Sequence, residues 1–245
     1  MDRGLEIAAS GMLTELVRQD ALSSDLANAS TPGYKPEVVG QASFGDVLLA
    51  NTQTGQVIGS VGGGTAITKT MVDMTQGSIE STGAPLDVAL EGPGFLAVQT
   101  AQGTRYTRNG ELAVDAQGRL TNSAGNPVLD PAGKTIAVGA HAADLSISTL
   151  GVIAAGGKTL GTIGITSLTN PAKLGNNLFT GTVGAKPTGT TISQGSLEGS
   201  AVNPTTAMID MIVSLRAYES SQKVIHSIDE TLSRGIDSAG SVGGS

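Results

Sequence analysis

The residues of this chain that could do chemistry are few and scattered. The sequence has 245 residues, no cysteine and only two histidines, His141 and His226. The lack of thiolates excludes a cysteine nucleophile, a thiolate zinc site and an iron–sulfur cluster, and two distant histidines do not indicate a metal site. Each histidine is interpreted as a solvated side chain. The sequence therefore predicts no catalytic, cofactor-binding or metal-binding residue.

Two glycine-rich segments imitate catalytic motifs but have the wrong spacing. Gly156-Gly157-Lys158-Thr159 ends like a phosphate loop, yet Val152 occupies the position where that loop requires glycine. The segment 195–199 is not a nucleophile elbow, because its serine directly follows glycine. The polar segment 105–110 either binds a ligand or forms a turn whose arginines make hydrogen bonds within or between subunits. We favour the turn, and we expect the protein not to be an enzyme.

The charge balance excludes several classes of partner. The chain has 14 Lys+Arg against 21 Asp+Glu, for a net charge of -7, so nucleic-acid binding is not expected. No apolar run approaches the length of a membrane span. Asp2 and Glu6 stand where a cleaved signal peptide needs basic residues. We therefore expect no membrane insertion and no cleaved signal peptide.

Two helices are predicted at opposite ends of the chain. The first covers about residues 3–29, where apolar side chains recur at helical spacing, and Thr31-Pro32-Gly33 should end it. The second covers about residues 205–236, after an Asn203 N-cap and Pro204, and Gly235 and the tail should end it. Its a and d positions repeat as in a coiled coil, and seven of nine are apolar or aromatic: Met208, Met211, Leu215, Tyr218, Gln222, Ile225, Asp229, Leu232 and Ile236.

The middle of the chain has strand signals. Short alternating runs at 86–90, 95–99, 111–115 and 162–166 predict strands, and the segments 100–104 and 115–119 predict hairpin loops. Residues 36–75 predict an extended linker with a short helix near 44–49. The fold class is α+β, with the N- and C-terminal helices forming a coiled-coil-like pair beside a central all-β domain.

The predicted domains are an N-terminal axial helix (1–35), an extended linker (36–75), the β-domain (76–200), a C-terminal axial helix (201–237) and a flexible tail (238–245). A pair of long helices leaves apolar flanks uncovered, so other copies of the chain should cover them. The alternative is that both helices pack on the β-domain of the same chain.

Four segments resemble a known family, in the same order along the chain. Residues 26–35, with the sequence LANASTPGYK, resemble the N-terminal signature of bacterial flagellar axial proteins. Residues 85–95, 106–120 and 195–200, the last leading into the C-terminal helix, resemble that family's later motifs. The resemblance covers nearly the whole chain, and a flagellar basal-body rod protein is the member that it indicates.

This resemblance implies a structural subunit that polymerises into a hollow helical tube and transmits torque to the hook and filament. Its partners would be copies of itself, other rod and hook axial proteins and the flagellar type III export apparatus. It would lie in the basal body, in the cell envelope or periplasmic space. The expected assembly residues lie in both helices and the first turn: Leu5, Met12, Leu16, Leu26, Asn28, Pro32, Gly33, Tyr34, Met208, Met211, Leu215, Tyr218, Ile225 and Leu232.

Several alternatives stay open on sequence alone. The C-terminal motifs favour the proximal-rod type, whereas the segment 216–219 is similar to the distal-rod and hook versions. A secreted β-rich binding or adhesin domain would explain the Gly/Thr/Ser-rich middle but not the two helices. A cell-wall hydrolase would need a catalytic pair, which the sequence does not offer.

Overall fold

The computed structural model describes residues 2–43, 45, 47–50, 57–139, 144–185 and 187–242. The chain forms two compact units. The first, here called the helical unit, comprises Met1–Leu26, Glu37–Thr70 and Pro204–Ser245. The second, the β unit, comprises Ala27–Pro36 and Met71–Asn203. The fold is α+β, as the sequence predicts.

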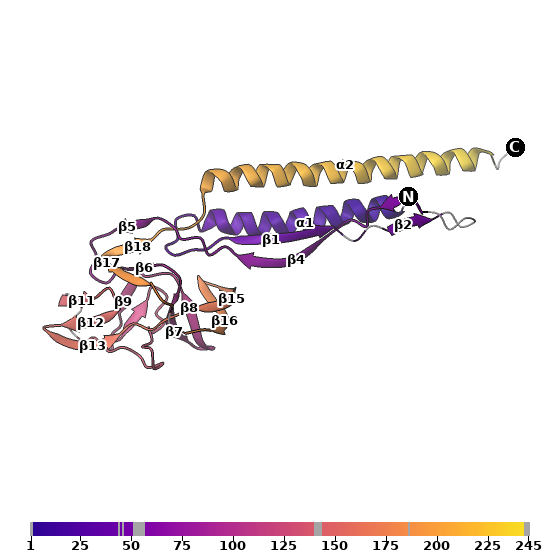
Figure 1. Ribbon diagram of the computed structural model, residues 1–245. Coiled ribbons are helices and arrows are strands. Elements are labelled where there is room, and N and C mark those ends of the chain that lie inside the picture. The colour runs from indigo at the N-terminus through magenta and orange to yellow at the C-terminus, as the bar shows by residue number, and fades with distance from the viewer. Residues whose placement is uncertain are drawn as a thin grey trace. The chain divides into compact units, whose positions relative to one another are not determined.

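Two antiparallel helices dominate the helical unit (Figure 1). Helix α1 spans Asp2–Ala27 and α2 spans Pro204–Val242. At 1.5 Å per residue they are about 39 and 58 Å long. The prediction that α2 ends at Gly235 and that a flexible tail begins at 238 is wrong, because the helix continues through Gly235 to Val242. A glycine inside a helix weakens it by about 1 kcal/mol. A single such residue in a helix of 39 is not enough to end it.

The linker is built from strands. It contains β1 (Glu37–Ser43), β2 (Val47–Ala50), β3 (Val57–Val61) and β4 (Thr65–Val72), with β1 paired to β4 and β2 paired to β3. The predicted short helix near 44–49 is therefore wrong over 47–49, which belong to β2, and Phe44 and Asp46 lie outside the described residues. The start of β4 is attached to α1, since the Thr65 amide donates to Ser10 Oγ at 3.2 Å.

The β unit contains the remaining strands. Its largest sheet has the order β14-β7-β8-β16-β15, beside a three-stranded sheet β11-β12-β13 and the pairs β9-β10, β6-β17 and β5-β18. The bounds are β5 Ile79–Ser81, β6 Val88–Glu91, β7 Phe95–Thr100, β8 Gly103–Thr107, β9 Leu112–Val114, β10 Leu120–Asn122, β11 Leu145–Ile147, β12 Val152–Ala155, β13 Lys158–Thr162, β14 Ile165–Thr166, β15 Leu168–Gly175, β16 Leu178–Val183, β17 Thr191–Gln194 and β18 Ser196–Glu198.

Both predicted hairpins are confirmed. Strands β7 and β8 pair in antiparallel register from Leu96↔Thr107 to Thr100↔Gly103. Strands β9 and β10 pair at Val114↔Leu120, and Gly118 in the loop has φ 74°, a conformation that glycine adopts without steric cost. Alternation along these strands directs one face inward, so the apolar residues of several short sheets form one core.

The β unit has a continuous aliphatic core and a small aromatic one. Sixteen buried side chains form the first cluster, with Leu96, Val98, Leu120 and Ile153 fully buried. Phe95, Tyr106 and Phe179 form the second, in which the rings of Phe95 and Phe179 lie 5.3 Å apart. This unit therefore has what a stable domain needs within a single chain.

Candidate assembly interface

Small side chains line the contact between α1 and α2. A side chain at Gly4 would meet Ile228 Cδ1 at 3.4 Å, and one at Gly11 would meet Ser221 Oγ at 3.6 Å. Ser214, which is fully buried, donates a 2.6 Å hydrogen bond to the Glu15 carboxylate. The paired numbers rise on one helix and fall on the other, as in an antiparallel pair. These contacts place the face with Gly4, Gly11 and Glu15 on α1 against the face with Ser214, Ser221 and Ile228 on α2.

The inward face of α2 agrees with the predicted a and d positions at some places and lies one residue away from them at others. The half-buried residues Met211, Tyr218, Ile225 and Leu232 coincide with the predicted stripe. Between them, however, Ala207 and Ser214 are buried, whereas the predicted Met208 and Leu215 are 50% and 46% exposed. At these two places the smaller side chain is the buried one, and the larger apolar neighbour is left on the surface.

On α1, the four predicted residues divide in the same way. Leu5 and Leu16 are 37% and 45% exposed. Met12 and Leu26 are half-buried. The helical unit thus carries large apolar side chains that are only partly covered within the described part of the chain. In a single chain this arrangement leaves apolar surface in water, which favours association.

The predicted residues of the first turn lie inside the β unit and make contacts there. The Thr31 amide donates to the Asn28 carbonyl at 3.0 Å, and the carbonyl of Pro32 accepts from Asn177 Nδ2 at 2.8 Å. Tyr34 is buried, with Lys173 Nζ 4.0 Å from its ring centroid. These contacts hold the turn that follows α1 to the β unit.

Gly33 is the tightest point of this turn. It has φ 66°, and a β-carbon at this position would collide with the backbone of Arg108 and Asn109. Its amide donates to the Glu198 carbonyl at 2.7 Å. The turn therefore requires glycine for two reasons, its left-handed conformation and the close approach of another backbone.

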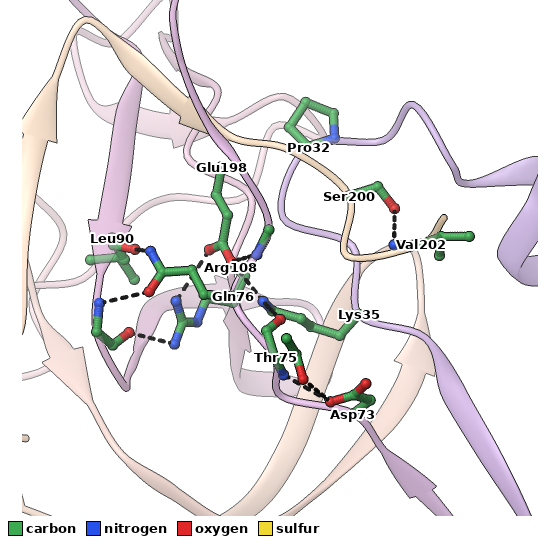
Figure 2. Close-up of polar contacts among 12 residues, drawn as sticks. Pro32, Lys35, Asp73, Thr75, Gln76, Leu90, Arg108, Glu198, Ser200 and Val202 are labelled. Carbon is green, nitrogen blue, oxygen red and sulfur yellow. Dashed lines mark hydrogen bonds and ion pairs between the residues drawn. The ribbon is translucent and has the colours of Figure 1, made fainter. Parts of the chain in front are cut away.

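A buried cluster of three charged residues lies next to this turn (Figure 2). Lys35 Nζ lies 2.6 Å from Glu198 Oε1, and Arg108 Nη1 lies 3.1 Å from Glu198 Oε2. The Lys35 and Glu198 side chains are fully buried and that of Arg108 is 3% exposed. Oε1 also accepts the Gly77 amide at 3.1 Å. One carboxylate thus joins four chain segments.

Two further donors of the cluster bind backbone carbonyls, whereas the buried Arg108 Nε has no hydrogen-bond partner among the described residues. Lys35 Nζ donates to the Thr75 carbonyl at 2.6 Å, and Arg108 Nη2 donates to the Gly92 carbonyl at 2.7 Å. Burial lowers the pKa of Lys35, although its hydrogen bond to Glu198 opposes the shift. The pKa of Asp73, beside the cluster, is lowered chiefly by a hydrogen bond from the Thr75 hydroxyl. Such a network stabilises only while every member is present.

The sequence contained a signal for this cluster that the motif analysis did not use. Lys35, Arg108 and Glu198 each stand inside one of the segments that carry the family resemblance. Lys35 and Glu198 are the single charged residues of their segments, and a lone charge among glycines and apolar or small residues indicates a buried ion pair as readily as a surface site. The expectation that the arginines of 105–110 make hydrogen bonds within the chain holds for Arg108.

The described part of the chain has neither a candidate membrane span nor a candidate metal site. No helix there is both long and apolar enough to cross a membrane. Among the same residues, no group of three or more His, Asp or Glu side chains lies close enough together to hold a metal ion. The two helices and the motif cluster are thus the features on which a functional reading rests.

Together these features define a structural protein that presents long apolar helices for assembly. Comparison with known proteins gives the family. Residues 5–35 match the family described as flagella basal body rod protein, residues 89–155 the flagellar hook protein FlgE/F/G D1 domain, and residues 193–238 the flagellar basal body rod FlgEFG protein C-terminal region.

Three relatives match over almost their whole length. The flagellar basal-body rod protein FlgF of Caulobacter vibrioides is 30% identical, with 99% of this chain and all of the relative covered. FlgF of Escherichia coli is 35% identical, covering 96% and 97%. The rod protein FlgG of Bacillus subtilis is 33% identical, covering 95% and 97%.

The chain belongs to the flagellar basal-body rod protein family. It is a structural subunit of the flagellar basal-body rod and not an enzyme. It assembles with other flagellar rod and hook axial proteins in the basal body. The secreted binding domain and the wall hydrolase are therefore replaced by this assignment.

Proposed function

We propose that this protein is a proximal-rod subunit of the FlgF type. Its α1 and α2 form a coiled-coil-like pair, which polymerises with other copies into a hollow helical tube that transmits motor torque to the hook and filament. Two of the three relatives described above are FlgF proteins. The FlgG relative supports the second candidate, a distal-rod subunit.

One observation carries the assembly proposal. The helical unit exposes large apolar side chains on both helices, including Leu13 at 65% and Ile209 at 57%, while the β unit buries its own core. The assembly residues are the helical ones predicted from sequence, from Leu5 to Leu26 on α1 and from Met208 to Leu232 on α2. The predicted set also includes Asn28, Pro32, Gly33 and Tyr34 of the first turn, which belong to the β unit.

The proposal includes the route to this location. The subunit passes through the flagellar type III export apparatus without a cleaved signal peptide and reaches the basal body in the cell envelope. The support is the family membership. An isolated helix pair that exposes this much apolar surface is expected to be frayed before assembly and ordered within the polymer.

Substitution of Leu215 tests the assembly role. Leu215 is 46% exposed in the single chain, so Leu215→Asp should leave the fold intact and prevent assembly by placing a charge in an apolar contact. Ser220→Asp, at an exposed polar position of the same helix, is the matched control. The measurement is motility together with hook protein in basal-body fractions. Normal rods with Leu215→Asp would contradict the proposal.

A further inference from the structure

A pocket in the β unit lies against the side chain of Arg108. Its volume is about 340 Å³, near the lower end of the range for sites that bind small ligands. Most of its lining is apolar, including Met74 and Phe95, and its polar side chains are those of Gln76, Ser167 and Arg108. Apolar walls with a few polar groups are the usual composition of a ligand site, so these three side chains decide what the pocket can bind.

Two of the three polar side chains are engaged within the walls of the pocket. The Gln76 amide donates to the Leu90 carbonyl at 3.0 Å and accepts from the Gly92 amide at 3.1 Å (Figure 2). The Ser167 hydroxyl donates to a backbone carbonyl at 2.8 Å. Arg108 therefore remains as the group that would hold a ligand.

Arg108 is a buried cation with a hydrogen-bond donor that is not used. Its side chain is 3% exposed, and its Nε has no hydrogen-bond partner among the described residues. A guanidinium has five N–H groups, and this one donates to Glu198 Oε2 at 3.1 Å and to the Gly92 carbonyl at 2.7 Å. A buried donor without an acceptor is unfavourable, so an acceptor that enters the pocket would gain binding free energy from it.

The buried cluster to which Arg108 belongs has one more positive than negative charge when Lys35 is protonated. Lys35 and Arg108 share the single carboxylate of Glu198. Asp73 lies near Lys35 but is only half-buried, and its carboxylate accepts from the amide and the hydroxyl of Thr75 at 2.9 and 2.6 Å. An anion in the pocket would compensate the excess positive charge of the buried groups.

We infer that this pocket binds a carboxylate on a short apolar stem, with the carboxylate on the Arg108 guanidinium and the stem against Met74 and Phe95. Arginine and carboxylate have matching geometry, whereas a phosphate brings more charge and more acceptor oxygens than one guanidinium can satisfy. The carboxylate is that of a free small molecule or of an acidic side chain on a neighbouring axial subunit. The site lies within one chain and goes beyond the proposed function.

Titration of the full-length protein with propionate tests the site in solution. Amide chemical shifts of the pocket residues Gly92 and Gly94 would be followed by nuclear magnetic resonance. The control compound is propionamide, which has the same shape without the charge. We expect saturable shifts with propionate and an affinity at least about tenfold lower for propionamide. Absence of saturable shifts with propionate, or equal affinity for both compounds, would overturn the inference.

A carboxylate supplied by the chain itself should compete with the probe. Met74 is half-buried in the pocket wall, so Met74→Glu would place a carboxylate in the pocket and should abolish propionate binding. Met74→Gln has nearly the same shape without the charge and is the matched control, which should keep the binding. Circular dichroism would show that both variants are folded. Equal propionate affinity in the two folded variants would contradict the site.

Cysteine labelling identifies the source of the carboxylate, because the chain has no cysteine of its own. If a neighbouring subunit supplies it, a maleimide should label Met74→Cys in the isolated protein but not in basal bodies. Leu150→Cys, at a position that is 63% exposed in the β unit, is the control. Labelling of Met74→Cys in both preparations would assign the site to a free carboxylate. Absence of the parent protein from basal bodies would contradict the proposed function and leave the propionate result unaffected.

Discussion

Removal of the Glu198 charge is the sharpest test of the buried cluster. In Glu198→Gln, the ammonium of Lys35 and the guanidinium of Arg108 would stay buried without a compensating anion. Loss of one partner from a buried ion pair costs about 3–5 kcal/mol. Whole domains are stable by only about 5–15 kcal/mol, so the β unit should lose a large fraction of its stability.

Differential scanning calorimetry of the full chain would measure this loss. For a unit of this size, each kcal/mol shifts the midpoint by about 2–4 °C, so we expect the β-unit transition to fall by about 6–20 °C. Glu80→Gln is the matched control, because Glu80 is an exposed carboxylate on β5, which pairs with the strand of Glu198. Its effect should lie within about 0.5 kcal/mol of zero. A midpoint for Glu198→Gln equal to that of the control would refute the reasoning.

Three further outcomes are expected. Burial lowers the pKa of Lys35 in the native state. Between that lowered pKa and about 10.4, the unfolded chain holds a proton on this lysine that the native state has lost. The unfolding free energy should therefore contain a contribution that rises with pH in this range. Lys35→Met should remove that component in denaturant titrations at several pH values, and identical slopes would contradict it. Gly33→Ala should destabilise the β unit by about 2–4 kcal/mol, because a β-carbon meets the backbone of Arg108, and an unchanged midpoint would disprove this strain. Ser214→Leu should overpack the contact between α1 and α2 and lower the stability by about 1–3 kcal/mol. Gly235→Ala, whose β-carbon would meet open space, should stabilise the helix by up to about 1 kcal/mol. Circular dichroism melts in which Ser214→Leu is the more stable of the two variants would refute the burial of Ser214 in this contact.

Local signals carried most of the elements. Apolar spacing identified both helices, and alternating runs with glycine loops identified the hairpins of β7–β8 and β9–β10. These features depend on residues close in sequence, so a single sequence contains them. Helix ends were less accurate, as the continuation of α2 past Gly235 shows, because one unfavourable residue is outweighed by its neighbours.

The choice of the inward face of α2 required the tertiary structure. Two choices of inward residues are possible here, and they lie one residue apart. One choice buries Met208 and Leu215, and the other buries Ala207 and Ser214. Hydrophobicity favours the first. The structure instead buries Ala207 and Ser214, and Ser214 donates a hydrogen bond to the Glu15 carboxylate of α1. Hydrophobicity predicts which side chains leave water, and it does not predict which of them fit between two helices.

The sequence by itself therefore determined the family, the fold class and the absence of a recognisable catalytic motif, since these follow from local pattern and from motifs in a fixed order. Only the tertiary structure joined Lys35 to Glu198 across 163 residues and Arg108 to Glu198 across 90. No local pattern specifies such a pairing, because it depends on which distant segments share a buried space. The same holds for the inward face of α2, because burial of Ala207 and Ser214 depends on the position of α1, which is distant in the sequence.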